Sequence, residues 1–322
     1  MPVQKHLFVL DPLERLNLKL DSSLRVAHAL TLRGHEAYMT HVERMGWRTG
    51  TPAFASVSRL TFVGDDPTSA GTSLYSTDSL ANFTAIHMRK DPPFDMDYVA
   101  TTWLLDAAGT RVYNSPAALR TINEKLAVLM FPQFSRPALV SADAEALLNF
   151  IVSECHGDGI IKPLELFGGR GVTRITLPDA NDVNSRKATL RTLANETGDG
   201  HHFRLVQAFD PAIFHGEVRA FAAFGEPLAW CLKRPADGNF LANTAAGASL
   251  TAYDPSREEI ATVKAMAGRL FREGVAFVGF DIIGGHISEM NLTSPRLLTP
   301  PGDPTDYYGI LAERLIEDVA RS

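Results

Sequence analysis

Three oxygen-bearing side chains lie close together in the stretch 277–291, which reads FVGFDIIGGHISEMN. The β-branched and aromatic residues before the glycine pair predict a buried strand, and the apolar–polar alternation after it predicts the second strand of a hairpin. With a three-residue turn at 284–286, Asp281 lies opposite Glu289, and Asn291 follows on the same face. Carboxylate and amide oxygens are ligands that suit Mg²⁺. The hairpin therefore predicts a magnesium site, with solvent-facing polar side chains as the alternative.

A pair of cations follows another apolar stretch, FTAIHM at 83–88. Arg89 and Lys90 come directly after it and precede Asp91-Pro92-Pro93. Ligands bind at the carboxyl edge of open α/β sheets, and the prolines hold the segment extended, so the cations would meet an anion at little ordering cost. A surface turn with a solvated basic pair is the alternative.

A glycine-rich loop follows a lysine in the middle of the chain. The short strand expected at 159–163 contains Lys162, and Gly168, Gly169 and Gly171 lie in the next loop. Glycines let backbone N–H groups approach an anion closely, and a lysine beside such a loop can neutralise phosphate. No Gly-Lys-Ser/Thr follows, so this is not the P-loop pattern, and a simple tight turn is the alternative.

The composition excludes several classes of protein. The chain has 322 residues, of which 45% are hydrophobic and 21% charged, which predicts a soluble protein of two or three packed subdomains. The net charge of −6 gives no basic surface for nucleic acid. No apolar run is long enough to span a membrane, and the N-terminal HLFVL indicates a strand rather than a secretory signal. Cys155 and Cys231 make no metal-ligand spacing, which fits a reducing cytoplasm.

The elements that position these residues begin in α/β order and then turn to antiparallel pairs. Strands are expected at 6–10, 35–40, 58–63, 83–88, 159–163, 173–177, 203–209, 217–224 and 228–232, and in the hairpin 277–292. Helices are expected at 24–33, from Ser115-Pro116 through Asn123-Glu124-Lys125, at 257–273 and at 307–320. The loose polar segment 233–249 is expected to be a mobile lid, and residues 45–80 give no clear order beyond one strand.

Taken in this order, the motifs resemble those of the bacterial glutathione synthetases, members of the ATP-grasp superfamily. The matching segments are Asn17-Leu18-Lys19, Asp21-Ser22-Ser23, MRKDPPFD at 88–95, NEKL at 123–126, IIKPL at 160–164, Gly168-Gly169, Gly216-Glu217-Val218-Arg219, CL-x-R at 231–234, the segment 243–247, and FVGFDIIG through NLTSP at 277–295. Residues 45–80 and those after Pro295 match poorly.

The resemblance implies both a fold and a reaction. The fold is an open α/β domain at about 1–121 and an ATP-grasp domain at about 122–322, with subdomains of about 122–200 and 201–322 and the lid near 233–249. In the reaction, ATP phosphorylates the carboxylate of γ-glutamylcysteine, and the amine of glycine displaces phosphate. ATP and two Mg²⁺ ions are implied as cofactors. The expected protein is a cytoplasmic homo-oligomer with small-molecule substrates and no nucleic-acid or membrane partner.

The resemblance also implies roles for individual residues. ATP would be bound by Lys125, Lys162, Gly168, Gly169, Gln207, Phe209 and Glu217, with both lysines on the phosphates. The metal would be held by Asp281, Glu289 and Asn291, and the substrates by Arg89, Asn243 and Ser294. Arg219 and Arg234 are implied as catalytic residues, with Arg219 stabilising charge on the transferring phosphoryl group. No protein nucleophile is needed, because positioning and charge stabilisation suffice for acyl-phosphate chemistry.

Two loops depart from the family pattern. The family's Asp-Gly-Met-Gly-Gly reads ELFGG at 165–169 here and is followed by Arg170. In the lid, the family's Arg-Gly-Asn is replaced by Leu241-Ala242-Asn243, and the following Leu-Ala-Ala-Gly-Gly by TAAGA at 244–248, so that an arginine is lost. Charge on a transferring phosphoryl group still needs a partner in a site without water. We therefore predict Arg170 as a further catalytic residue that supplies this charge, with a solvated arginine as the alternative.

Two other functions stay open at this point. One is a related ligase with a different acyl donor or amine acceptor. The other is a regulatory protein that binds ATP without turnover. Retention of Lys125, Lys162, Arg219 and the three oxygen ligands argues against the second, because unpaired charges in a cleft are costly to keep.

Overall fold

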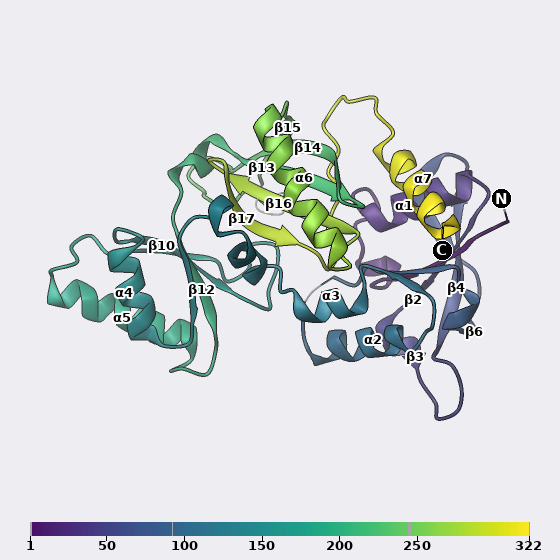
Figure 1. The fold of residues 1–322 in the computed structure, drawn as a ribbon, viewed down its shortest axis with the longest axis horizontal. Coiled ribbons are helices and arrows are strands. Elements are labelled where there is room, and N and C mark those ends of the chain that lie inside the picture. The colour runs from purple at the N-terminus through teal and green to yellow at the C-terminus, as the bar shows by residue number, and fades with distance from the viewer. Residues whose placement is uncertain (1, 92, 244–246, 322) are drawn as a thin grey trace.

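The computed structural model describes residues 2–91, 93–243 and 247–321, and its strands form three sheets (Figure 1). The N-terminal sheet lies at one end of the molecule and a four-stranded sheet at the other, with a five-stranded sheet between them. This mixture of helices and sheets confirms the predicted α/β class. The predictions that fall on Pro92 and on residues 244–246 lie outside the described residues.

The N-terminal sheet has the order β3-β4-β2-β1-β7-β8, with β5 and β6 also paired to β4. β1 runs parallel to both β2 and β7, and β7 runs parallel to β8. The central strand is buried from His6 to Val9 because both of its faces are covered. The strands are β1 (Lys5–Val9), β2 (Glu36–Thr40), β3 (Met45–Gly46), β4 (Phe54–Val63), β5 (Asp66–Thr72), β6 (Ser76–Ser79), β7 (Ala85–Met88) and β8 (Arg111–Tyr113).

Two helices from opposite ends of the chain pack together on this sheet (Figure 1). The first, α1 (Ser22–Leu32), confirms the predicted helix: the side chain of Asp21 accepts a hydrogen bond from the Leu24 N–H at 2.8 Å and caps its N-terminus. The second, α7 (Tyr307–Ala320), has the predicted bounds. Its apolar stripe joins the core of α1, so the C-terminal segment is anchored to the N-terminal sheet.

The four-stranded sheet has the order β11-β10-β12-β9 and carries two helices on one face. Its strands are β9 (Ala138–Ser141), β10 (Asp158–Pro163), β11 (Thr173–Thr176) and β12 (Arg204–Ala208). The helices are α4 (Ala144–Ser153) and α5 (Val183–Thr197), which the sequence analysis did not anticipate. Leu147, Ile151 and Leu193 of these helices pack on Ile161 and Val206 of the strands.

The five-stranded sheet is antiparallel and has the order β15-β14-β13-β16-β17. Its strands are β13 (Glu217–Ala223), β14 (Glu226–Arg234), β15 (Ser249–Ala252), β16 (Phe277–Ile283) and β17 (His286–Asn291). Helix α6 (Arg257–Arg272) packs against it through Val263, Met266 and Leu270, and a capping box at Ser256 and Glu259 starts the helix. The predicted hairpins and the predicted helix are confirmed.

One predicted helix is wrong at its C-terminal end. Helix α3 (Pro116–Thr121) stops before Asn123, so Asn123, Glu124 and Lys125 lie in a turn. The Asn123 side-chain oxygen accepts the N–H groups of Lys125 and Leu126, which satisfies them without a continuous helix. Among the described residues of the N-terminal part, the other α-helix is α2 (Met96–Asp106).

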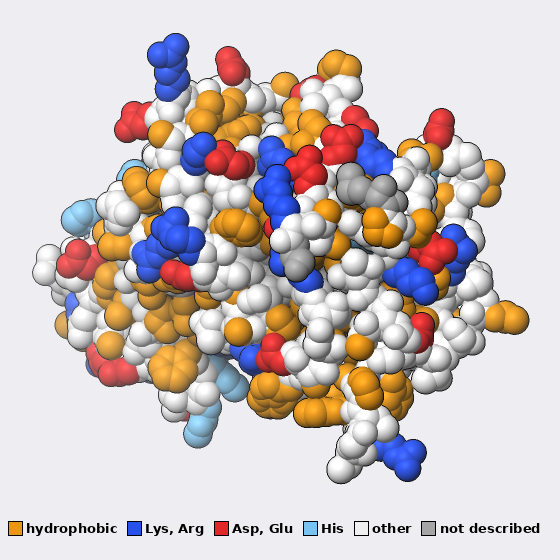
Figure 2. Space-filling view, turned by 45° about the vertical axis from the view of Figure 1, so that its right-hand side comes forward, with side chains coloured by type: hydrophobic (Ala, Val, Ile, Leu, Met, Phe, Trp, Pro, Cys, Tyr) orange, Lys and Arg blue, Asp and Glu red, His pale blue; other side chains and the backbone are white. Residues whose placement is uncertain are grey.

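The visible face of the molecule mixes charges of both signs (Figure 2). Lys and Arg side chains alternate with Asp and Glu there, and no broad basic field is seen on this face. None of the helices in the described residues is long and apolar enough to cross a membrane.

Candidate active site

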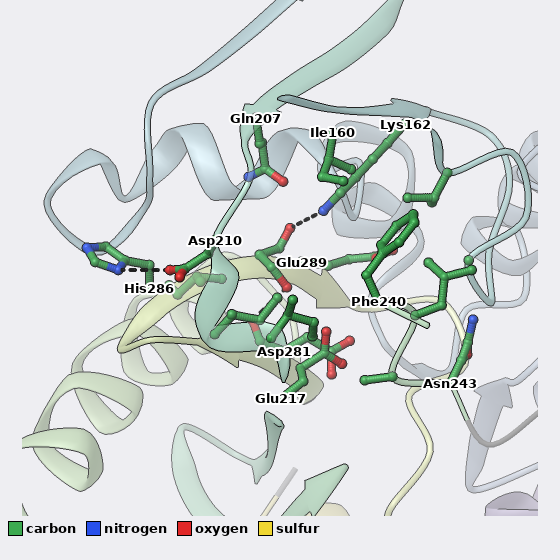
Figure 3. Close-up of a pocket in the computed structure, with 18 of the residues that line it drawn as sticks. Ile160, Lys162, Gln207, Asp210, Glu217, Phe240, Asn243, Asp281, His286 and Glu289 are labelled. Carbon is green, nitrogen blue, oxygen red and sulfur yellow. Dashed lines mark hydrogen bonds and ion pairs between the residues drawn. The ribbon is translucent and has the colours of Figure 1, made fainter. Parts of the chain in front are cut away.

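A cavity of about 160 Å³ lies between the four-stranded and the five-stranded sheets (Figure 3). Strands β10 and β12 contribute to one wall, strands β13, β14, β16 and β17 to the other, and the segment 240–243 lies at its edge. The predicted site residues that line it are Lys162, Gly168, Gly169, Gln207, Phe209, Glu217, Arg219, Asn243, Asp281, Glu289 and Asn291. The fold therefore gathers most of the predicted nucleotide and metal residues in one place.

The hairpin of β16 and β17 has the predicted register at the cavity. Asp281 pairs opposite Glu289, and Gly279 pairs opposite Asn291. Directly opposed residues of an antiparallel pair place their side chains on the same face. The three oxygen-bearing side chains thus share the cavity face, as predicted.

The turn of this hairpin is one residue shorter than predicted. Ile283 pairs directly with His286, so only Gly284 and Gly285 form the turn, both with positive φ. Ile282 pairs with Ile287 and Asp281 with Glu289, so Ser288 is the extra residue of a bulge on β17, and the expected register is restored beyond it.

The Asp281 carboxylate is surrounded by donors from three side chains. Arg219 donates Nε–H to Oδ1 at 2.8 Å and Nη2–H to Oδ2 at 2.9 Å. Lys233 donates to Oδ1 at 2.7 Å, and Asn291 Nδ2–H donates to Oδ2 at 3.0 Å. Burial alone would raise the pKa of Asp281, but the charges of Arg219 and Lys233 outweigh it and hold that pKa well below its ordinary value. Asp281 is therefore ionised at neutral pH.

Lys233 is a charged cavity residue that sequence reasoning missed, and Arg136, Asp210 and His286 are others in the lining. Lys233 is only 6% exposed, it lines the cavity, and it contacts Glu217 as well as Asp281. On β14 it pairs opposite Glu217, so the strand alternation that places Glu217 in the cavity places Lys233 there too. The same alternation leaves the neighbouring Arg234 exposed and away from the cavity lining. The structure therefore does not bring Arg234 into the site.

Glu217 has an unusual environment for a carboxylate. Burial and the nearby charge of Asp281 raise the pKa of Glu217 to about 7, although Lys233 and Arg219 act in the opposite direction. Figure 3 shows Glu217 and Asp281 side by side at the base of the cavity. Lys233 contacts both carboxylates and offsets their mutual repulsion.

The two predicted phosphate lysines both lie near β17, where Glu289 acts electrostatically on Lys162 and contacts Lys125. Lys162 Nζ donates to the Ser288 carbonyl oxygen at 3.0 Å and lines the cavity, and burial lowers its pKa. Lys125 is 2% exposed and lies behind the lining, where Nζ is 3.4 Å from Glu289 Oε1 and also donates to the Leu166 carbonyl oxygen. Lys125 thus ties the glycine loop to the hairpin.

Part of the cavity lining is aromatic and apolar. The ring of Phe209, at the end of β12, is covered by the Arg174 guanidinium at 3.6 Å from its centroid. Phe240 lies edge-on to Phe209 at a centroid distance of 6.3 Å, and Gln207 and Ile160 lie nearby in the lining. Flat apolar surfaces with a few polar groups suit a planar base.

The glycine loop and the segment expected to form a lid contact each other. Asn243 Nδ2–H donates to the Gly168 carbonyl oxygen at 2.6 Å. Gly169 has a φ of 75°, and a Cβ at this position would lie 2.2 Å from Asn243 Nδ2. Glycine is therefore required there both by backbone conformation and by the close approach of Asn243. The predicted lid bounds of 233–249 are wrong at both ends, because Lys233 and Arg234 belong to β14 and Ser249 belongs to β15. The mobility of the part between these strands stays a prediction.

Arg170 does not reach the cavity in this structure. Its side chain is exposed, and its guanidinium lies 4.7 Å from the ring centroid of Phe167. It is not among the residues that line the cavity. This geometry supports the solvated-arginine alternative, and the predicted catalytic role lacks a structural basis here.

Arg89 and Ser294 lie outside the main cavity. Arg89 lines a separate small cavity, where Nε–H donates to Ser23 Oγ and Nη2–H donates to the Pro295 carbonyl oxygen, both at 2.9 Å. Burial lowers the pKa of Arg89, although nearby Asp21 and Asp91 raise it. Ser294 hydrogen-bonds to Asp91. Their role in substrate binding stays a prediction.

The donor set of the hairpin fits a hard divalent cation. Asp281, Glu289 and Asn291 supply oxygen ligands from one face of two paired strands. Only two of the three are carboxylates. Within the described ranges, no group of three or more His, Cys, Asp and Glu side chains forms a metal site by itself. A metal ion here would therefore need the amide oxygen of Asn291 as its third protein ligand, and its remaining ligands would come from the molecule bound in the cavity.

Comparison with known proteins assigns both parts of the chain to one family. Residues 4–120 match the N-terminal domain of prokaryotic glutathione synthetase, and residues 124–299 match its ATP-grasp domain. The glutathione synthetase of Nitrosomonas europaea is 33% identical over 98% of both chains, and that of Bordetella pertussis is 36% identical over 94% of both chains.

Solved structures of ATP-grasp proteins share the fold at much lower sequence identity. D-cycloserine synthetase DcsG is 16% identical with a TM-score of 0.68 and covers 98% of this chain and 99% of its own. An ATP-grasp RimK-domain protein of Sphaerobacter thermophilus is 19% identical with a TM-score of 0.59, over 97% and 99% of the two chains. These similarities confirm the predicted ATP-grasp fold, and the family matches confirm the predicted resemblance. The chain belongs to the prokaryotic glutathione synthetase family.

Proposed function

We propose that this chain is an ATP-dependent ligase that joins γ-glutamylcysteine and glycine, with release of ADP and phosphate. The observation that carries the proposal is the cavity between the two sheets. It collects Lys162, Glu217, Arg219, Asp281 and Glu289, the family's expected charged residues, around one space. Similarity to glutathione synthetases over nearly the full chain supports the substrates.

The nucleotide lies with its base against the aromatic side chains and its phosphates against the charged ones. Phe209 and Gln207 face the adenine, and Lys162 and the glycine loop face the phosphates. Lys125 acts from behind the lining by holding the glycine loop and Glu289 in place. This orientation is supported by a lining that contains both aromatic side chains, which suit a base, and a lysine with two glycines of the loop, which suit phosphates.

Mg²⁺ is held by Asp281, Glu289 and Asn291, with two ions as the predicted number. The hard oxygen donors of the hairpin support this assignment. When bound, the metal neutralises charge on the β- and γ-phosphates.

The protein's own contribution to the chemistry is positioning and charge. An oxygen of the substrate carboxylate attacks the γ-phosphorus, the bond to the β-phosphate oxygen breaks, and ADP leaves. The glycine amine then attacks the acyl carbon, phosphate leaves, and the amine loses a proton. Arg219 is held by two hydrogen bonds to Asp281 at the cavity wall, where its charge stabilises the transferring phosphoryl group. The expulsion of water between the sheets protects the acyl phosphate.

The dipeptide binds on the side of the cavity that leads toward the N-terminal sheet. Ser294 and Arg89 follow β17 and β7, and Asp91 links them electrostatically and by hydrogen bonding. Asn243 contributes from the lid segment. We further propose that the protein is a homo-oligomer and that it works in the cytoplasm. The two free buried cysteines suit a reducing compartment.

ADP release with a panel of γ-glutamyl dipeptides and amino acids tests the proposal. Release that requires both γ-glutamylcysteine and glycine is expected. Release that prefers another pair would identify a related ligase. Nucleotide binding without ADP release for any pair would favour a regulatory protein.

A further inference from the structure

All acceptor positions of the Asp281 carboxylate are taken by side chains of this chain. An ionised carboxylate offers about four lone-pair positions on its two oxygens. Arg219 Nε and Lys233 Nζ occupy Oδ1 at 2.8 and 2.7 Å, and Arg219 Nη2 and Asn291 Nδ2 occupy Oδ2 at 2.9 and 3.0 Å. A metal ion can therefore bind Asp281 only if one of these donors leaves.

The donors differ in how readily they can leave. Arg219 holds both carboxylate oxygens through a bidentate pair, the strongest arrangement available to these groups. Asn291 is uncharged and carries an amide oxygen of its own, so it can join a metal site instead of opposing it. Lys233 makes a single contact to Asp281 and brings a positive charge to the position that a cation would take.

Lys233 also has a second anion within reach. Its ammonium contacts Glu217, which lies directly opposite on β13. A lysine that is only 6% exposed needs a counter-ion, because a buried unpaired charge is costly. Glu217 lets Lys233 give up Asp281 without becoming unpaired. Neither Lys233 nor this exchange has a role in the proposed reaction described above.

We propose that Lys233 competes with the metal ion for Asp281. In the nucleotide-free protein the Lys233 ammonium contacts Asp281 and lowers the affinity of this carboxylate for divalent cations. A cation binds when Lys233 leaves Asp281 and keeps only its contact with Glu217. The inference rests on the proposed metal site at Asp281. Its consequence is an order of binding. Divalent cations bind weakly to the free protein and enter with the nucleotide, whose phosphates supply the further oxygen ligands.

A titration of Mn²⁺ into nucleotide-free protein tests this competition without any turnover. The free aqueous ion is followed by its electron paramagnetic resonance signal. Lys233→Met removes the charge and keeps most of the side-chain length, and it is expected to tighten Mn²⁺ binding about tenfold or more, the scale of one lost competing contact. Lys233→Arg keeps the charge and is expected to bind as weakly as the wild type. Equal affinity in wild type and Lys233→Met, or no measurable binding in either, overturns the inference.

Asp281→Asn separates failure of the inference from failure of the metal site. If Asp281→Asn binds Mn²⁺ as well as the wild type does, the metal assignment itself is wrong. If binding depends on Asp281 but Lys233→Met leaves it unchanged, only the competition is wrong. Circular dichroism of each variant establishes that the sheets are intact.

A double-mutant cycle with Glu217 gives an independent readout and does not rely on one variant being well folded. Glu217→Gln removes the second anion, so Lys233 should hold Asp281 more firmly and Mn²⁺ affinity should fall. In the Lys233→Met background the same change should have little further effect. An equal loss of affinity in both backgrounds would make Glu217 a metal ligand and would overturn the proposed exchange.

Discussion

Glu124 holds the loop that connects the hairpin of β16 and β17 to the segment containing Ser294. A single oxygen, Oε1, accepts the N–H groups of Leu292 and Thr293 at 2.5 and 2.8 Å and the Thr293 hydroxyl at 2.9 Å. Burial raises the pKa of Glu124, although these hydrogen bonds lower it. We predict that Glu124→Ala destabilises the protein and lowers turnover, because three donors lose their acceptor at once.

The magnitude follows from the number and type of these contacts. A hydrogen bond to a charged group contributes about 1.5–3 kcal/mol, and a buried donor without an acceptor costs about 1–3 kcal/mol. Glu124 is partly buried, so water can replace some of the lost contacts. We therefore expect Glu124→Ala to lower the free energy of unfolding by about 3 kcal/mol. Glu124→Gln keeps an acceptor oxygen in the same place and should cost about 1 kcal/mol.

Urea denaturation of the nucleotide-free protein measures this difference, with Glu154→Ala as the matched control. Glu154 is exposed at the end of α4, so its removal should change the stability by less than about 0.5 kcal/mol. The order Glu124→Ala, then Glu124→Gln, then Glu154→Ala is expected for the size of the effect. A Glu124→Ala protein within about 1 kcal/mol of the wild type would refute the reasoning.

Three further predictions concern the phosphates, the glycine loop and pH. Lys125→Ala and Lys162→Ala should each weaken ATP binding by about 1–3 kcal/mol in a calorimetric titration, and unchanged affinity in both would contradict their role. Arg170→Ala should leave kcat within about twofold of the wild type, because the side chain is exposed and stacks on Phe167; a fall of about tenfold would restore its predicted catalytic role. Burial lowers the pKa of His6 to about 3, below its unfolded value of 6.5, so its contribution to stability is complete above pH 6.5 and is lost as the pH falls toward 3. The stability of the wild type relative to His6→Gln should therefore fall by about 2 kcal/mol between pH 7 and pH 5, and a constant difference across that range would show that His6 protonates equally in both states.

Local signals were sufficient for much of the fold. The N-cap at Asp21, the apolar stripe of 307–320 and the alternation in 286–291 each specify one element through contacts within a few residues. The pairing of Asp281 with Glu289 was also predictable, because period-two alternation fixes which residues share a face.

Other elements depend on partners far along the chain. Residues 45–80 form strands only because β4 provides a long edge for β3, β5 and β6, and their Gly, Thr and Ser content gives little pattern of its own. Helix α3 ends before Asn123 because the Asn123 side chain takes over the local N–H groups. Such competition between side chain and helix is not visible in periodicity.

The site residues divide in the same way, into those that local signals predict and those that depend on partners far along the chain. Lys233 could have been found by extending the strand expected at 228–232 by one residue, because its pairing with the strand that begins at Glu217 places Lys233 opposite that predicted site residue. The separation of Arg89 from the main cavity could not have been predicted from the sequence. It depends on hydrogen bonds to Ser23 and to the Pro295 carbonyl oxygen, which lie 66 and 206 positions away in the chain.

The most direct test of the central claim follows the oxygen atoms of the substrate carboxylate. γ-Glutamylcysteine labelled with ¹⁸O in its cysteine carboxylate is incubated with ATP, Mg²⁺ and glycine, and the released phosphate and the peptide product are analysed by mass spectrometry. An acyl phosphate requires that one ¹⁸O atom appear in the phosphate and the other stay in the new amide. Unlabelled phosphate released together with glutathione would contradict activation of the carboxylate by ATP in this site.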